Sequence, residues 1–263
     1  NGHNLFGMGM DEEIFASNKT VFHGQLIGFI LAESRNLAKY AASLVRIEYE
    51  PLPEILTIKD AILKNSFYES NRLIVKGEFD SNTFNLENSD DKIIEGEMEV
   101  GGQEHFYLEP HGCIVIPKNE DNEYEIYSST QNLNEVQREV SHMLGVPANR
   151  IVCRIKRIGG GFGGKESRST HIALATAAAA QKVKRPVRCI VDRDVDMVLS
   201  GARHPFYGKY KLRITKDGFF KAFDLELINN AGCSLDLSGA VMDGAIFRGT
   251  DNCYNFPNMR VLG

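Results

Sequence analysis

Residues 157–169 read RIGGGFGGKESRS, and the interpretation of the whole chain depends on this stretch. Five glycines surround Phe162, between an apolar, strand-like segment (151–158) and an alanine-rich, helix-like segment (169–183). A glycine-rich turn at the start of a helix lets backbone N–H groups approach an anionic ligand with no Cβ in the way. The sequence therefore predicts a ligand-binding loop, and the chemical class of the ligand has to be argued.

Three local interpretations compete. From Gly159 to Gly164 the loop fits the dinucleotide spacing GxGxxG, and Asp192 ends the next apolar strand. However, Asp192 is further along than that motif places its acid, and Glu166 puts a carboxylate where pyrophosphate would bind. An NTP-binding loop needs Ser or Thr where Glu166 stands. A packing turn needs fewer glycines, since each costs about 0.5–1 kcal/mol of backbone entropy.

Composition predicts a soluble globular protein of one or two domains. The chain has 263 residues, of which 43% are hydrophobic and 25% are charged. A net charge of −5 provides no basic footprint for nucleic acid or an anionic membrane surface, and no apolar run is long enough to span a membrane. The five cysteines form no CxxC pair, which indicates a reducing compartment rather than a disulfide framework or a local zinc or iron–sulfur site.

The first part of the chain predicts a small α/β unit. Apolar residues alternate within residues 20–33, Ser34 can cap a helix over 35–44, and residues 45–49 alternate again as a strand. Residues 76–92 are polar and acidic, which is typical of an exposed loop or linker.

The second part combines helices with antiparallel strands. Asn132 and Glu135 resemble a capping box that opens a helix ending at Leu144, with Gly145 just beyond it. Two strand-like segments flank the turn residues 215–218 and predict a β-hairpin. The predicted fold class is α/β (α+β) with a mixed sheet.

The loop and its surroundings also resemble a known family. Lys156–Thr170 is similar to the molybdopterin loop of the xanthine dehydrogenases and aldehyde oxidases. Other segments fit the same family in order, so that the resemblance covers essentially the whole chain. They are Gly102–Glu109, Ser129–Asn132, Met143–Arg150, Arg185–Cys189, Gly201–Phe206 and Asp251–Tyr254.

The resemblance implies a domain arrangement. Residues 1–56 resemble the end of the family's α/β hammerhead domain, 57–97 a linker, and 98–263 the first part of the molybdenum-cofactor-binding domain. Since the chain starts without Met and stops within an extended segment, we expect an internal fragment of a longer enzyme. The family's catalytic Glu lies beyond residue 263, so we expect no catalytic residue in the fragment and no activity from it alone.

The resemblance also implies a chemistry. A molybdenum–molybdopterin centre would oxidise purines, from hypoxanthine to xanthine to urate, by hydroxyl transfer. Electrons would leave through two 2Fe–2S clusters and FAD to NAD or oxygen. The implied enzyme is a cytoplasmic homodimer, with the peroxisome as an alternative location, and it binds no nucleic acid or membrane. Aldehyde oxidase is the alternative within the family, and a stand-alone NAD-binding module is the alternative from another class.

Particular residues match the family's cofactor and substrate positions. Gln131 matches the amide that approaches the metal's ligands, and Phe162 matches the residue whose backbone reaches the cofactor, with Gly161 and Gly163 beside it. These residues are expected to bind the cofactor, with Gln131 and Phe162 nearest the molybdenum. Glu166 matches the acid that hydrogen-bonds the purine ring.

One position departs from the pattern. Gly244 stands where xanthine-oxidising members carry a substrate-binding Arg, and Arg248 is the nearest arginine that could replace it. The choice between xanthine and aldehyde therefore stays open. His105, Glu109 and His111 have a spacing that could ligate a metal on one strand face, but Pro110 would break that strand and the family has no metal there.

Overall fold

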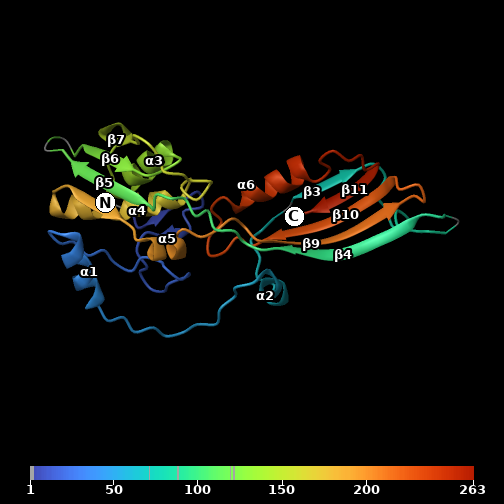
Figure 1. The fold of residues 1–263 in the computed structure, drawn as a ribbon, viewed down its shortest axis with the longest axis horizontal. Helices are drawn as coiled ribbons and strands as arrows, with labels where there is room; N and C mark the ends of the chain where they lie inside the picture. Colours follow the sequence, from blue (N-terminus) through green and yellow to red (C-terminus); the bar gives the residue numbers. More distant parts are fainter. Residues whose placement is uncertain (1–2, 71, 88, 119, 121) are drawn as a thin grey trace. The chain divides into compact units, whose positions relative to one another are not determined.

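The computed structural model describes residues 3–70, 72–87, 89–118, 120 and 122–263. The chain divides into two compact units, each made from two separate stretches of sequence. Unit 1 comprises Asn1–Pro53 and Glu104–Arg203, and unit 2 comprises Glu54–Gln103 and His204–Gly263. Both units combine helices with a sheet, so the predicted mixed α/β fold class is confirmed (Figure 1).

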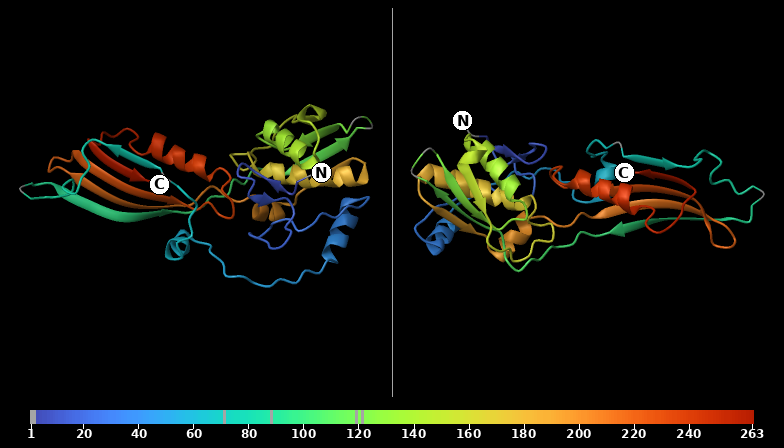
Figure 2. Two further views of the ribbon diagram at one scale, coloured as in Figure 1. Left: turned by 180° about the vertical axis from the view of Figure 1, so that it is seen from behind. Right: turned by 90° about the horizontal axis from the view of Figure 1, so that it is seen from above.

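Unit 1 is built around a four-stranded sheet in the order β7-β6-β5-β8. Strands β6 and β7 are parallel and are joined through helix α3, whereas β5 is antiparallel to both β6 and β8. Helix α4 packs against α3, β5 and β8 (Figure 2). The elements are β5 (Gly112–Pro117), β6 (Tyr124–Ser128), α3 (Leu133–Leu144), β7 (Ile151–Arg154), α4 (Arg168–Val183) and β8 (Val187–Ile190).

Helix α4 lies at the centre of this unit. Ile172, Leu174 and most of the alanines of this helix are buried, so the helix has no broad solvent-exposed face. The small alanine side chains let strands and helices approach α4 closely from several directions. The alanine-rich sequence therefore serves the packing of α4. The helix begins at Arg168, shortly after the last glycine of the loop, so the packed helix fixes the end of that loop.

The predicted helix signals of unit 1 are confirmed. Asn132 Oδ1 accepts a hydrogen bond of 3.2 Å from the Glu135 N–H, and Gly145 ends α3 in the left-handed conformation at φ +66°. Ser34 caps α1 (Arg35–Ser43) in the same way. The smaller elements of unit 1 are β1 (Leu5–Phe6), β2 (Glu12–Glu13), the 3₁₀ turn Ala148–Arg150 and α5 (Arg193–Leu199).

Unit 2 is a five-stranded sheet in the order β3-β11-β10-β9-β4. The predicted hairpin is confirmed as β9 and β10, and α6 packs on the sheet through Met242, beside buried Phe256, Met259 and Val261. Helix α2 (Ile58–Leu63) is capped by Thr57. The other elements are β3 (Leu73–Lys76), β4 (Lys92–Val100), β9 (Phe206–Ile214), β10 (Phe220–Asn229), α6 (Ser238–Asp243), the π-helix Gly244–Arg248 and β11 (Asn258–Leu262).

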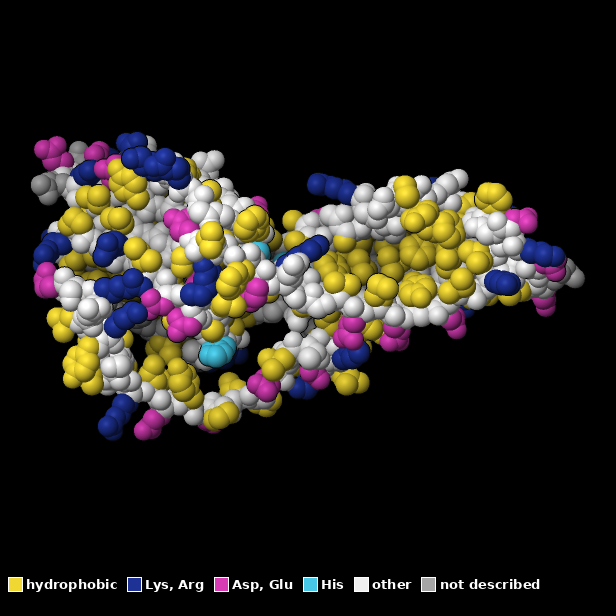
Figure 3. All heavy atoms as spheres, in the orientation of Figure 1, with side chains coloured by type: hydrophobic (Ala, Val, Ile, Leu, Met, Phe, Trp, Pro, Cys, Tyr) yellow, Lys and Arg dark blue, Asp and Glu magenta, His cyan; other side chains and the backbone are white. Residues whose placement is uncertain are grey.

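The strands predicted within residues 20–33 and 45–49 are wrong. Neither segment forms a β-strand in the described residues, and residues 22–24 form a turn, although the helix between the two segments forms. Several of their apolar side chains stay exposed, for example Ile27 (40%) and Ile47 (47%), although Phe29 packs against the core of unit 1. Figure 3 shows hydrophobic side chains open at the surface of both units. Alternation predicts which face of a strand is apolar, but a strand also needs a neighbour to accept its hydrogen bonds.

The predicted linker, 57–97, contributes structure to unit 2. It contains α2, β3 and the first part of β4, while its polar acidic stretch connects β3 with β4. The boundaries at residues 56 and 97 stay predictions for the family's domains. All five cysteines are free thiols, and no helix in the described part of the chain is long and apolar enough to cross a membrane.

Candidate functional site

The glycine loop leaves β7, enters α4 and has an unusual backbone. Gly160, Phe162 and Gly163 have φ angles of +91°, +53° and +92°. A bulky residue such as Phe162 rarely adopts this left-handed conformation, and its side chain is 75% exposed, so core packing does not explain its position. Backbone strain of this kind is concentrated at ligand-binding sites.

The loop presents free hydrogen-bond donors. The backbone N–H groups of Gly160, Gly161 and Phe162 find no acceptor among the residues that the structure describes. The preceding N–H, of Gly159, is already used, because it donates to Glu109 Oε2 at 2.8 Å. Successive free amides in such a turn form a concave site for an anion.

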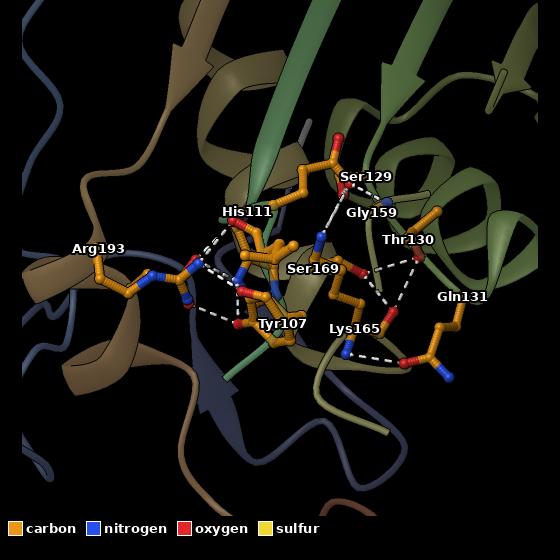
Figure 4. A network of polar contacts seen from close by, with 12 residues as sticks. Tyr107, His111, Ser129, Thr130, Gln131, Gly159, Lys165, Ser169 and Arg193 are labelled. Atoms are coloured by element: carbon orange, nitrogen blue, oxygen red, sulfur yellow. Dashed lines mark hydrogen bonds and ion pairs between the residues drawn. The ribbon is translucent and has the colours of Figure 1, made fainter. Parts of the chain in front are cut away.

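Gln131 is held against this loop with its amide in one orientation. Its Oε1 accepts hydrogen bonds from the Gly163 N–H at 2.9 Å and from the Lys165 N–H at 3.2 Å. Because both donors are backbone N–H groups, the oxygen and nitrogen of the amide are distinguished. Figure 4 shows the amide nitrogen on the side away from Lys165, and among the described residues it has no acceptor. Gln131 therefore offers an uncharged donor beside the loop.

The loop packs so closely against Gln131 and His105 that two of its positions accept only glycine. A Cβ on Gly161 would lie 2.3 Å from Gln131 Oε1, and one on Gly164 would lie 2.7 Å from His105 Cγ. Glycine is therefore required at these two positions by contact with neighbouring side chains.

The structure brings together most of the predicted site residues. Gln131, Gly161, Phe162, Gly163 and Glu166 all belong to one corner of unit 1. The Glu166 side chain is exposed and has no partner within the described residues, while its backbone N–H donates to the Gly163 carbonyl at 3.2 Å. The predicted purine-binding carboxylate is thus free to meet a ligand.

Gly244 is placed differently, because it belongs to unit 2. It is the first residue of the π-helix Gly244–Arg248, and a Cβ there would meet no atom within 4 Å. Arg248, at the end of this turn, is exposed. A π-turn inside helical structure is common at functional sites. This one contains Gly244, which stands at the expected position of the substrate-binding Arg, and Arg248, the arginine that could replace it.

A buried polar network behind the loop was missed from the sequence. Lys165 is fully buried, and its Nζ donates to Ser129 Oγ at 2.7 Å and to Glu109 Oε2 at 3.1 Å (Figure 4). The same ammonium lies 4.6 Å from the centre of the Tyr107 ring. No sequence pattern signals this, since a Lys beside glycines usually points to solvent.

Tyr107 connects the network around Lys165 to a second buried cluster, formed by Asp196 and His111. Its hydroxyl donates to Asp196 Oδ1 at 2.6 Å, and Asp196 Oδ2 accepts from the His111 N–H at 2.6 Å and lies 3.0 Å from His111 Nδ1. Burial raises the pKa of Asp196, but the hydrogen bonds from His111 and Tyr107 outweigh it and lower this pKa to about 2. Asp196 is therefore a charged acceptor at neutral pH in the interior of unit 1.

These contacts also account for the spacing that suggested a metal. Glu109 binds Ser129, Gly159 and Lys165, and His111 binds Asp196, so the histidines and Glu109 do not converge. No group of three or more metal-ligating side chains occurs in the described ranges.

The sheet order argues against the dinucleotide interpretation. That motif needs a strand, a loop, a helix and an adjacent parallel strand. Here β7 and β8 lie at opposite edges of the sheet, with β6 and β5 between them. Asp192, the expected ribose ligand, instead forms ion pairs with Arg35 and Lys39.

Comparison with known proteins identifies the family. The family model for the molybdopterin cofactor-binding domain matches residues 67–263, and that for the aldehyde oxidase and xanthine dehydrogenase a/b hammerhead domain matches residues 1–53. The chain therefore belongs to the aldehyde oxidase and xanthine dehydrogenase family.

Two curated relatives illustrate the similarity. Xanthine dehydrogenase/oxidase of Felis catus is 50% identical over 262 residues, which is 100% of this chain and 19% of the relative. Xanthine dehydrogenase of Oryza sativa subsp. japonica is 48% identical over 254 residues, 96% of this chain and 18% of the relative. The chain thus spans about a fifth of the length of the curated relatives that it matches.

Solved structures show the same fold. The aldehyde oxidoreductase from Desulfovibrio gigas aligns with a TM-score of 0.81 at 24% identity, covering 98% of this chain and 29% of that one. The aldehyde oxidoreductase from Desulfovibrio desulfuricans aligns with a TM-score of 0.83 at 20% identity, covering 99% and 30%.

The loop of unit 1 fits a molybdopterin cofactor. Three free backbone donors and the outward amide of Gln131 suit the oxygen and sulfur acceptors of such a group. The missing side chain of Gly161 lets Gln131 pack against the loop, and at Gly163 a Cβ would meet only His105 Nε2, at 3.9 Å. The exposed Phe162 lies between them in the left-handed conformation. These residues are the ones that would hold the cofactor.

Proposed function

We propose that this chain is part of a molybdenum hydroxylase that oxidises purines, from hypoxanthine to xanthine to urate. The observation that carries the proposal is the row of free N–H groups at Gly160–Phe162 beside the locked amide of Gln131. The bound cofactor would supply the oxidation of an electrophilic carbon by hydroxyl transfer. The chain's own residues would bind and orient: Gln131 and the loop toward the cofactor, and Glu166 toward the substrate.

The full-length protein would need further components, which we propose on the similarity to xanthine dehydrogenases. They are two 2Fe–2S clusters and FAD, with NAD or oxygen as the final acceptor. A homodimer in the cytoplasm is the proposed state. The direct test is to purify the full-length protein and measure bound molybdenum together with urate formation from hypoxanthine. Molybdenum-free protein that forms no urate would contradict the proposal.

Aldehyde oxidation is the second candidate function. The observation that favours it is Gly244, which provides no positive charge where xanthine-oxidising relatives are expected to have Arg. The two predictions that follow separate the candidates.

Glu166→Ala should lower kcat/KM for hypoxanthine roughly 10–100-fold, which corresponds to one charge-assisted hydrogen bond. Turnover of a small aldehyde should change little, because such a substrate cannot reach the Glu166 carboxylate. Steady-state kinetics with both substrates would measure this, with the exposed Glu50→Ala as the charge-matched control. Equal losses for both substrates would show that Glu166 supports the structure or the cofactor instead.

Gly244→Arg should raise xanthine turnover selectively, by about tenfold, because the added cation would stabilise negative charge that develops on the substrate. The substitution is sterically possible, since a Cβ at this position meets no atom within 4 Å. The matched control is Gly249→Arg, which adds the same charge to an exposed position in the same segment. Without a selective gain, either Arg248 already supplies the charge or xanthine is not the natural substrate.

A further inference from the structure

The buried ammonium of Lys165 connects the two ends of the glycine loop. Lys165 immediately follows the last glycine, and its side chain has no exposed surface. Its Nζ binds Glu109 Oε2, and the same oxygen accepts the Gly159 N–H at 2.8 Å, at the first glycine of the loop. The Glu109 N–H also donates to the Gly159 carbonyl at 3.1 Å. The start of the loop is thereby held on both sides by one residue.

The main chain of Lys165 binds Gln131. The Lys165 N–H donates to Gln131 Oε1, and the Lys165 carbonyl accepts from the Gln131 N–H at 2.8 Å. Thr130 and Ser169 donate to the same carbonyl. The backbone of Lys165 therefore contacts Gln131, whose amide is proposed to face the cofactor. The side chain of Lys165 reaches the opposite end of the loop through Glu109.

The charges of this pair are not equally buried. The Lys165 side chain is fully buried, whereas the Glu109 side chain is 42% exposed. Burial lowers the pKa of Lys165, and the nearby Glu109 acts in the opposite direction. Losing the carboxylate would leave the ammonium in the interior without its ion-pair partner, whereas losing the ammonium would leave a carboxylate that water can still reach.

We propose that the ion pair of Lys165 and Glu109 forms a lock that sets the shape of the glycine loop and, through it, the direction of the Gln131 amide. Both are positioning residues: neither needs to touch the substrate or the reacting atoms. The effect of this lock on the cofactor rests on the proposed function, in which the glycine loop binds the molybdenum cofactor. The lock itself is a property of the protein with or without the cofactor.

The experiment uses the full-length enzyme carrying Glu109→Gln, Lys165→Met or both substitutions. Hydrogen exchange of the Gly159, Gly163 and Lys165 amides is followed by mass spectrometry, before and after removal of the cofactor, and molybdenum content is measured in parallel. The controls are Lys182→Met, which neutralises an exposed lysine of α4, and Glu50→Gln.

We expect Glu109→Gln to speed exchange of these amides by at least about tenfold, because the ammonium loses its partner. Lys165→Met should have a smaller effect, and the double variant should lie closer to wild type than Glu109→Gln does. Molybdenum content should follow the same order. If the two substitutions only removed packing contacts, their effects would add and the double variant would exchange faster than Glu109→Gln. Slower exchange in the double variant therefore indicates the loss of an ion pair.

Wild-type exchange in Glu109→Gln, or a double variant worse than Glu109→Gln, would overturn the lock. If Lys165→Met does not fold, Glu109→Gln and the double variant still provide the decisive comparison. If the wild-type enzyme contains no molybdenum, the proposed function fails, but the exchange of the cofactor-free protein still tests the lock on its own.

Discussion

Gly161→Val in the full-length enzyme is expected to leave less than about one tenth of the wild-type molybdenum bound. A Cβ at this position would lie 2.3 Å from Gln131 Oε1, so either the loop or the amide must move. Gln131 cannot move without losing the hydrogen bonds from the Gly163 and Lys165 N–H groups. The substitution therefore disrupts the free donors and the oriented amide together.

Molybdenum content per mole of purified enzyme measures this effect, with circular dichroism to confirm folding. The matched control is Gly28→Val, at a position of unit 1 where a Cβ meets no atom within 4 Å and φ is not positive. Wild-type molybdenum in a folded Gly161→Val enzyme would contradict the assignment of the loop.

Asp196→Ala is expected to have the largest effect on stability, lowering the free energy of unfolding by about 3–5 kcal/mol. The substitution leaves the Tyr107 hydroxyl and the His111 N–H without their buried acceptor. Urea unfolding of the chain followed by circular dichroism would measure the loss. Asp217→Ala, in the exposed hairpin turn, should change stability by no more than about 0.5 kcal/mol. A similar small change for Asp196→Ala would show that the network contributes little.

The same carboxylate predicts a pH dependence. Its pKa is lowered to about 2 in the folded chain, from an ordinary value of 3.8, so the folded state favours the charged form. This contribution, about 2 kcal/mol, is fully present above about pH 4 and is lost as the pH falls through 2. Asp196→Asn should remove that part of the acid sensitivity, and an unchanged slope of stability against pH would show that other groups cause it.

Local signals of the sequence predicted much of the fold. Asn132 and Gly145 mark the ends of α3 because caps satisfy backbone groups within a few residues of each other. The same holds for the β9–β10 hairpin, whose turn residues lie between its strands. The strands predicted around α1 were wrong because pairing depends on distant segments, which alternation of apolar residues does not reveal.

The candidate site was predictable where residues act through type and spacing. The glycines carry such a signal, whereas Gln131, Phe162 and Glu166 were named only through the resemblance to a family. The structure places all of them in one corner of unit 1. The supporting residues carry none. Lys165 and Glu109 are 56 residues apart, and a lysine and a glutamate are ordinarily surface residues. Only the folded chain shows that Lys165 is internal and that its ammonium reaches Glu109.

The two-stretch construction of unit 1 affects the order in which it can form during synthesis. His171 binds the carbonyl of Ile14, which lies 157 residues earlier, and Arg168 forms an ion pair with Glu12. At ribosomal rates of about 5–20 residues per second, the segment around Ile14 waits about 8–30 s for these partners. During that time Phe6 and Ile14, both buried in the final structure, have no core to enter. We therefore expect these apolar side chains to stay exposed on the nascent chain until the residues that cover them have been synthesised.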